Sequence, residues 1–230
     1  DIRTRASKHG MDWIARFTKL WLWMGGRICW LAVDLNRCIQ GDVYEAYSCL
    51  TVKEVKKKAE CGESKEDIAV WIDSYARSNS RLIVATDGSV IGWKRWGGAA
   101  ARFFIDGAEV EDMQVSYFLG PVCTSQYAEL IAIREALAKI KVWFSISSEE
   151  QIAEITGGKR ITLLTDSAGA VELLLQYYEQ TKWGIIFDIV ELMWGLWSAH
   201  RVRFEIAWVP GHSNSYFNEK ADELATKTTK

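Results

Sequence analysis

The sequence has little proline and histidine, and its cysteines form no metal-binding pattern. Two prolines in 230 residues, together with 49% hydrophobic residues, exclude a disordered or low-complexity chain. The five cysteines include no Cys-x-x-Cys pair and have no histidine pair nearby, so we expect no zinc module. A chain of this length needs no disulfide framework. The cysteines therefore predict a reducing, intracellular compartment, either cytoplasm or nucleus.

The chain also lacks an excess of charge of either sign. Its 28 basic and 30 acidic residues give a net charge of −2, so no bulk positive field marks a nucleic-acid binder. Residues 1–80 carry +2, with 13 basic against 11 acidic residues, and residues 81–230 carry −4, with 15 against 19. A basic cluster comprises Lys53, Lys56, Lys57 and Lys58. We interpret this cluster as a solvated helix face rather than a nucleic-acid contact.

No hydrophobic run is long enough to predict a membrane span. The best candidate, residues 20–35, is interrupted by Arg27 and two glycines and falls short of the about 20 apolar residues that a span needs. No small-residue cleavage site follows this run, so it does not fit a secretory signal. Because the sequence opens with Asp1 rather than methionine, we expect it to be a piece of a longer protein.

Two regions of different pattern divide the chain near residue 80. Residues 1–80 lack alternating strand patterns and predict a mostly helical N-terminal block. Within this block, residues 64–75 form an amphipathic pattern that places Ile68, Trp71 and Ile72 on one inward face. Residues 81–230 predict a separate domain.

The second region alternates strand and helix patterns. Strands are predicted at 81–86, 96–105, 108–119, 160–165 and 201–209, and helices at 125–141, 168–178, 184–199 and 218–227. The order βββαβααβα is typical of an α/β fold. The first three strands are expected to be antiparallel, whereas 81–86 and 160–165, joined through a crossover helix, should lie side by side in parallel.

Four carboxylates lie at strand ends or beside the packed faces of helices in this pattern. Asp87 and Asp166 each follow a threonine at the end of one of the two parallel strands. They should therefore emerge at the same edge of the sheet, where ligands gather. Glu129 lies on the inward stripe near the start of the crossover helix, and Asp222 lies beside the packing face of the closing helix.

Each of these acids has an ordinary explanation when taken alone. Asp87 and Asp166 could form turns, Glu129 could interact with the helix dipole, and Asp222 could pair with a lysine. Four acids on four elements would instead raise one another's pKa unless a cation lies among them. Oxygen ligands suit Mg²⁺ or Mn²⁺, and two such ions would support phosphodiester hydrolysis.

The segments that carry these acids resemble one known family. TDGS at 86, TSQYAELIAIREAL at 124, LLTDSAGA at 163 and AWVPGHSNSYFNEKADELA at 207 are similar, in order, to the four acidic motifs of type 1 ribonuclease H domains. The last segment resembles the version found in non-long-terminal-repeat retrotransposon polyproteins. The resemblance covers residues 81–230. It implies a ribonuclease H-like fold, with a mixed five-stranded sheet and helices on both faces.

The resemblance also implies an activity, which is cleavage of the RNA strand of RNA–DNA hybrids by two ions of Mg²⁺ or Mn²⁺. It implies metal ligands at Asp87, Glu129, Asp166 and Asp222. His212 would shuttle protons or assist product release, although a solvent-exposed loop histidine is the alternative. The substrate contacts that it implies are Gly88, Ser89, Thr124, Ser125, Gln126, Ser167 and Asn218. A reverse-transcriptase domain in the same polyprotein is the expected partner.

Two other functions remain to be distinguished from this one. A ribonuclease H-like domain could tether nucleic acid without cutting it, but lost carboxylates would then be expected. A transposase or integrase of the same superfamily would cut DNA. The WVPGHS loop and the Ser125-Gln126 pair favour RNA–DNA hybrids over DNA.

Overall fold

The computed structural model describes residues 46–48, 50–93, 95–121, 123–158, 160–175 and 184–229. Most of the predicted N-terminal block, including the hydrophobic run at 20–35, lies outside these residues. Among the described helices, none is both long enough and apolar enough to cross a membrane.

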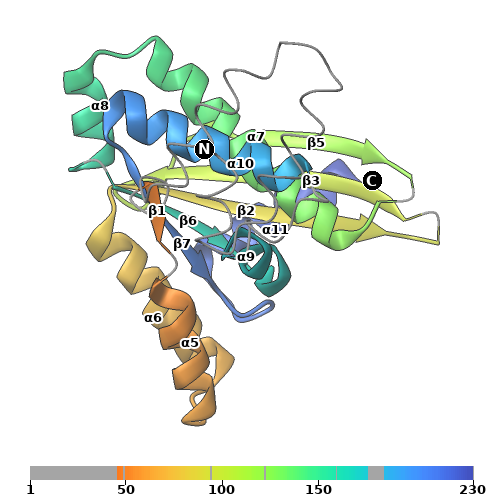
Figure 1. Ribbon diagram of the computed structural model, residues 1–230. Helices are drawn as coiled ribbons and strands as arrows, with labels where there is room; N and C mark the ends of the chain where they lie inside the picture. The colour runs from red at the N-terminus through yellow and green to blue at the C-terminus, as the bar shows by residue number, and fades with distance from the viewer. Residues whose placement is uncertain are drawn as a thin grey trace, which may run out of the picture.

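One mixed sheet forms the centre of the molecule (Figure 1). The five predicted strands are present as β2 (Leu82–Ile91), β3 (Trp96–Ile105), β5 (Val115–Gly120), β6 (Arg160–Thr165) and β7 (Arg203–Trp208). β3 pairs antiparallel with both β2 and β5, whereas β2, β6 and β7 are parallel neighbours. The predicted parallel pairing of the strands that precede Asp87 and Asp166 is thus confirmed.

Within the described part of the chain the sheet has seven strands, not the predicted five. β1 (Tyr47–Ser48) extends it beside β7, and β4 (Ala108–Glu109) pairs with β3. Each of these strands has two residues, which is too short for an alternating pattern to be recognised. The single strand predicted at 108–119 was also wrong, because a 3-10 turn, η2 (Glu111–Met113), separates β4 from β5.

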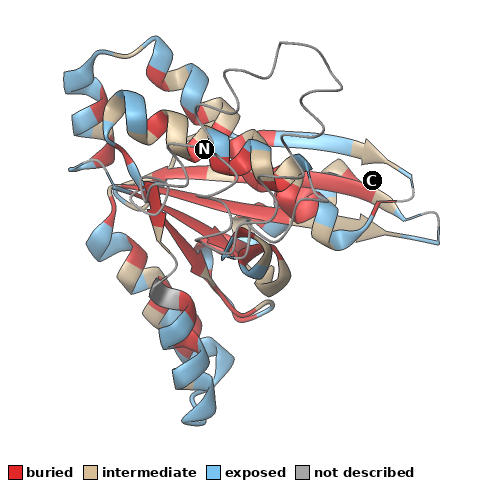
Figure 2. Ribbon diagram, viewed as in Figure 1, coloured by how far each residue is buried: buried red, intermediate tan, exposed pale blue. Residues whose placement is uncertain are grey.

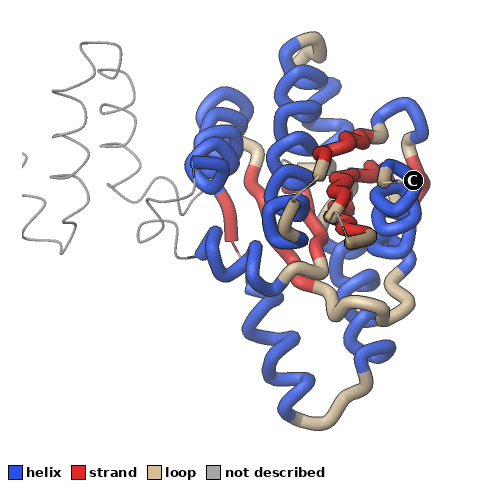
Figure 3. The backbone as a smooth tube through the Cα atoms, turned by 90° about the vertical axis from the view of Figure 1, so that its right-hand side faces the viewer, coloured by secondary structure: helices blue, strands red, loops and turns tan. Residues whose placement is uncertain are grey.

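Helices cover both faces of the sheet, as predicted (Figure 3). One face packs against α7 (Ser125–Ser145), α8 (Glu149–Thr156), α9 (Ala168–Leu175) and α10 (Gly184–His200), and the other against α6 (Lys65–Asn79) and α11 (Tyr216–Thr228). A hydrophobic core lies on each face of the sheet, and alternate residues of β2 pack into the two cores. Val84 belongs to the core on the first face and Ala85 to that on the second. Figure 2 shows the central strands buried between the two helical layers, whereas β5 at the edge is largely exposed.

α8 was not predicted, since residues 145–158 were interpreted as a surface insertion. The helix begins at a capping box, in which Ser148 accepts from the Gln151 amide and the Gln151 side chain accepts from the Ser148 amide. It ends at Gly157, whose left-handed backbone conformation is typical of a helix C-terminus. Both signals are visible in the sequence.

The described part of the N-terminal block packs on the sheet. The predicted amphipathic helix is α6, which follows α5 (Leu50–Glu60), and its Ile68 and Ile72 are fully buried while Trp71 is partly buried. These side chains share one hydrophobic core with Ala85 and Phe104 of the sheet. A domain boundary at residue 80 stays a prediction, but the described residues before it have no separate core.

The lysine cluster lies on α5, where Lys53, Lys56 and Lys57 are exposed, in agreement with the interpretation as a solvated face, whereas Lys58 is half-buried over the Trp71 ring. Lys56 pairs with Glu172 of α9 at 3.4 Å, and Lys58 pairs with Glu63 at 3.0 Å. Exposed ion pairs of this kind contribute little to stability, about 0–1 kcal/mol.

The shared core predicts that α6 contributes to the stability of the whole fold. We expect Ile72→Ala to lower the free energy of unfolding by about 2–5 kcal/mol, because it leaves a cavity under a fully buried side chain. Urea denaturation followed by circular dichroism measures this change. The control Val70→Ala, on the same helix and 66% exposed, should change stability little. Equal stability of the two variants would contradict the packing of α6 on the sheet.

Candidate active site

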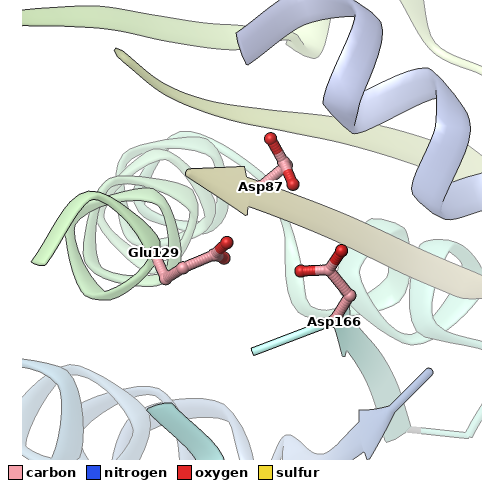
Figure 4. A group of neighbouring side chains, drawn as sticks. All are labelled: Asp87, Glu129 and Asp166. Carbon is pink, nitrogen blue, oxygen red and sulfur yellow. The ribbon is translucent and has the colours of Figure 1, made fainter. Parts of the chain in front are cut away.

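Three carboxylates from three elements meet at one place. Asp87 lies on β2, Glu129 on α7 and Asp166 directly after β6. Each offers an oxygen atom, and these three atoms lie within 4.8 Å of one another. Figure 4 shows the three side chains pointing toward a common space. The structure thus brings together three of the four acids predicted to hold metal.

The sheet places the two aspartates next to each other. The parallel register pairs Thr86 with Thr165, so the residues that follow, Asp87 and Asp166, leave adjacent strands at the same level. β6 ends at Thr165, and the chain then turns into α9, where the Ser167 hydroxyl accepts from the Ala170 amide at 3.2 Å. Ser167, predicted to contact substrate, is thus a helix cap in this structure.

Gly88 allows α7 to lie against β2 at the level of Glu129. A Cβ atom added at Gly88 would come within 2.6 Å of the Ala128 carbonyl carbon and 2.8 Å of the Glu129 Cα. Any side chain there would push the helix away from the strand. The Gly88 amide donates a hydrogen bond to the Glu129 carboxylate. The packing of α7 therefore explains this glycine, and a contact between Gly88 and RNA stays a prediction.

Burial and mutual repulsion raise the pKa of all three carboxyl groups. Burial raises the pKa of Asp87 to about 7, with further contributions from the negative charges of Asp166 and Asp222. Burial, followed by the charges of Asp87 and Asp166, holds the pKa of Glu129 well above its ordinary value. Burial also raises the pKa of Asp166, although a hydrogen bond from Asn218 opposes this shift. The group therefore takes up either protons or cations near neutral pH.

The residues present fit a hard divalent cation. Asp87 Oδ2 is buried and has no hydrogen-bond partner among the described residues. A buried carboxylate oxygen without a donor is costly unless a cation or water satisfies it. The three available ligands are all carboxylate oxygens, the donor type that Mg²⁺ and Mn²⁺ prefer. Asp87, Glu129 and Asp166 are thus the residues that could hold the metal.

Asp222, the fourth predicted ligand, lies near this group but outside it. Its side chain is exposed on α11 and accepts from Thr226 Oγ1 at 3.4 Å. Its negative charge nevertheless raises the pKa of both Asp87 and Asp166. A role of Asp222 as a metal ligand stays a prediction.

Asn218 contacts an acid of the group directly. It is buried on α11, one turn before Asp222, and its Nδ2 donates to Asp166 Oδ2 at 3.4 Å. Its Oδ1 is buried without a partner in the described part of the chain. Asn218 was predicted to contact substrate, whereas the contact seen here is to the Asp166 side chain.

His212 lies in the loop between β7 and α11. Its side chain is exposed, and its backbone adopts a left-handed conformation with φ of 54°. A positive charge on His212 lowers the pKa of Asp166. The preceding Gly211 approaches the same residue, since an added Cβ would lie 3.1 Å from Asp166 Oδ2. The structure thus places the His212 loop beside Asp166.

The other predicted substrate residues lie along β2 and at the start of α7. Thr124 caps α7, because its Oγ1 accepts from the Tyr127 amide at 3.1 Å. Ser125 is exposed, and Gln126 lies against Gly169 of α9. Ser89 is half-buried on β2. Their contacts with a nucleic acid stay predictions.

Two supporting residues were missed in the sequence. Thr165 Oγ1 donates to Glu129 Oε2 at 3.4 Å and accepts from the Ser167 amide at 3.1 Å. Trp208 Nε1 donates to the Asp166 carbonyl at 2.9 Å. Thr165 directly precedes an aspartate, as Thr86 does, and Trp208 lies in the WVPGHS segment, so both positions had a sequence signal.

The comparison that decides the family is a match to a family model. The model of the RNase H family matches residues 79–230. The chain belongs to the RNase H family. The predicted resemblance is thereby confirmed for the domain, and the acidic group identifies this RNase H as an enzyme with a metal-binding type of active site.

Solved RNase H structures are similar to this chain. RNase H1 from the halophilic archaeon Halobacterium salinarum NRC-1 is 20% identical, with 64% of this chain and 96% of that chain covered and a TM-score of 0.46. LC11-RNase H1, isolated from compost by a metagenomic approach, is 17% identical, with 65% and 95% covered and a TM-score of 0.49. A search of curated proteins found no match.

The close approach at Gly88 predicts opposite effects for the same substitution at two glycines. Gly88→Ala should destabilise the fold by about 1–3 kcal/mol or more, because its Cβ would overlap the backbone of α7. Gly195→Ala, in the interior of α10 with nothing within 4 Å, should stabilise by about 0.5–1 kcal/mol. Thermal unfolding measures both. Equal shifts of the same sign would contradict the packing described for Gly88.

The raised pKa values predict a pH-dependent stability of the metal-free protein. The folded state holds protons on Asp87 that the unfolded chain releases between pH 3.8 and about 7. The free energy of unfolding should therefore fall as the pH rises through this range. Urea denaturation in the presence of a chelator measures this slope, which Asp87→Asn should reduce and Mg²⁺ should offset near neutral pH. A stability that rises over this range in the chelated protein would contradict the carboxylate cluster.

Proposed function

We propose that this RNase H hydrolyses the RNA strand of RNA–DNA hybrids endonucleolytically, with two ions of Mg²⁺ or Mn²⁺. The observation that carries this proposal is the group formed by Asp87, Glu129 and Asp166, with a buried Asp87 oxygen that no described group satisfies. The match to the RNase H family supplies the class of substrate.

Asp87, Glu129 and Asp166 would hold the ions, with Asp222 as a fourth ligand from α11. Bound ions of this kind activate a water and stabilise the leaving oxygen of an in-line phosphoryl displacement. Asp87 is suited to contact both ions, because it offers an oxygen within 4.8 Å of those of Glu129 and Asp166 and its Oδ2 has no hydrogen-bond partner among the described residues. Asn218 orients Asp166 through its hydrogen bond at 3.4 Å. His212, in its exposed loop beside Asp166, would move protons or assist product release.

The start of α7 would recognise the RNA strand. Thr124, Ser125 and Gln126 precede Glu129 by three to five residues at the start of α7, so groups that read the hybrid would be close to the acids. Contacts to 2′-hydroxyl groups distinguish RNA from DNA, and hydroxyl and amide side chains supply both donors and acceptors for them. Gly88, Ser89, Ser167 and Asn218 would complete this surface around the acidic group.

We further propose that this RNase H works beside a reverse-transcriptase domain of a retrotransposon-like polyprotein. The support is the AWVPGHSNSYFNEKADELA segment, which resembles the version found in such polyproteins. The net charge of −4 on residues 81–230 adds a physical reason. Because phosphate contacts dominate affinity for nucleic acid, such a domain would hold a hybrid weakly and benefit from a neighbour. Free thiols at Cys61 and Cys123 agree with a reducing compartment, the cytoplasm or the nucleus.

Cleavage assays test the proposal directly. The full chain is incubated with labelled RNA–DNA hybrid, single-stranded RNA and duplex DNA, with Mg²⁺ or Mn²⁺. We expect cleavage of the hybrid alone, and a loss of at least about 100-fold in rate for Asp166→Asn, since one of the metal-holding carboxylates becomes neutral.

A matched control comes from α10. Asp188→Asn removes a half-exposed acid that is not part of the acidic group and that pairs only loosely with Arg134, at 3.6 Å, so it should leave the rate unchanged. Cleavage of duplex DNA would contradict the proposal in favour of a transposase-like function. Binding of the hybrid without cleavage, both alone and with a reverse-transcriptase domain added, would favour a tethering function.

A further inference from the structure

A carboxylate of α6 binds the first residues of α11. Both oxygens of Asp73 are used, because Ser215 Oγ donates to Oδ1 at 2.7 Å and the Tyr216 amide donates to Oδ2 at 2.8 Å. Asp73 is about two thirds of the way along α6, in the part of the chain that precedes the family match at residues 79–230. The contact therefore joins two segments more than 140 residues apart in the sequence.

The contact stabilises a helix N-terminus, where amide groups lack partners within the helix. Negative charge is favourable at this end, because the helix dipole presents a partial positive charge there. One turn further along α6, the Arg77 guanidinium lies 5.1 Å from the centre of the Phe217 ring and 5.7 Å from that of Tyr216. Two side chains of α6 thus fix the direction in which α11 begins.

A short series of hydrogen bonds connects this contact to the acidic group. Ser215 Oγ, held by Asp73, accepts from the Asn218 amide at 3.4 Å and caps α11. The Asn218 side chain then donates to Asp166 at 3.4 Å. Asp222 follows Asn218 by one helical turn, so its position also depends on where α11 begins.

We propose that Asp73 is a positioning residue of the nuclease site, through which α6 sets the place of Asn218 and Asp222 relative to Asp87 and Asp166. This inference rests on the proposed function, since it assigns α6 a part in the same site. It extends the site to a helix that lies, except for its last residue, before the part matched by the RNase H family model. α6 is then required for metal binding as well as for packing.

The consequence is a specific effect on metal affinity. Without the Asp73 carboxylate, the start of α11 loses two hydrogen bonds from α6 while β2, β6 and α7 keep their own contacts. Asp87, Glu129 and Asp166 therefore remain together, but Asn218 and Asp222 are less well placed. Loss of partners that orient metal ligands typically lowers metal affinity by about 10–100-fold.

The experiment compares Asp73→Ala and Asp73→Asn with the wild-type full chain. Mn²⁺ affinity is measured by isothermal titration calorimetry without substrate, and the Mg²⁺ concentration for half-maximal hybrid cleavage is measured separately. We expect Asp73→Ala to weaken Mn²⁺ binding about 10-fold or more. The Mg²⁺ concentration for half-maximal cleavage should rise by a similar factor. Asp73→Asn keeps one oxygen acceptor, so its Mn²⁺ affinity should lie between those of Asp73→Ala and the wild type.

Two controls separate positioning from general stability. Ile68→Val removes one methyl group from the buried face of α6 and should lower the midpoint of thermal unfolding without changing Mn²⁺ affinity. Glu66→Gln removes an exposed charge from the same helix and should change neither quantity. If Ile68→Val weakened Mn²⁺ binding as much as Asp73→Ala, or if Asp73→Ala bound Mn²⁺ as the wild type does, the inference would be overturned.

The two proposals fail in different ways. A wild-type chain that binds Mn²⁺ but cuts no hybrid, either alone or with a reverse-transcriptase domain added, would contradict the proposed function, and the calorimetric comparison would still test Asp73. Normal cleavage by the wild type with unchanged metal dependence in Asp73→Ala would contradict the role of Asp73 alone.

Discussion

Repulsion among three crowded carboxylates is the constraint around which this RNase H is built. Asp87 and Glu129 are only 5% and 6% exposed, so their charges lose most of the stabilisation that water would give. Thr165, Asn218 and the Gly88 amide each donate to a member of the group, but Asp87 Oδ2 keeps no donor among the described residues. The site therefore carries more negative charge than its hydrogen-bond donors compensate. A bound cation would supply the missing positive charge.

An incomplete site needs a rigid frame, and the two helical layers provide it. The parallel register of β2 and β6 fixes the separation of Asp87 and Asp166, and the missing side chain at Gly88 lets α7 bring Glu129 against the same strand. These contacts belong to backbone and buried core, so the acids have little freedom to move apart. The cost of their proximity is offset by packing elsewhere in the sheet.

Local patterns predicted much of this arrangement, and contacts distant in sequence account for what they missed. The repeated threonine–aspartate pairs at strand ends predicted that Asp87 and Asp166 would meet, because parallel strands share one carboxyl edge. The two-residue strands β1 and β4 carry no periodicity, so only tertiary pairing reveals them. The capping box at Ser148 is a local signal for the start of α8, although the prediction did not include this helix. Asp73 gave no signal, since its partners lie at the start of α11.

The exposed position of Asp222 is consistent with the same repulsion among carboxylates. Asp87, Glu129 and Asp166 come from two central strands and a helix packed directly on them, whereas Asp222 comes from α11, whose first turn is held by Asp73 and Arg77 of α6. A fourth buried carboxylate would add to a repulsion that already raises the pKa of the other three. Its exposed place on α11 leaves the charge of Asp222 hydrated, so this acid does not bear the desolvation cost of the buried ones. Under the role proposed for Asp73, the contact between α6 and α11 sets where Asp222 lies relative to the three buried acids, so the packing of α6 bears on the chemistry of the site.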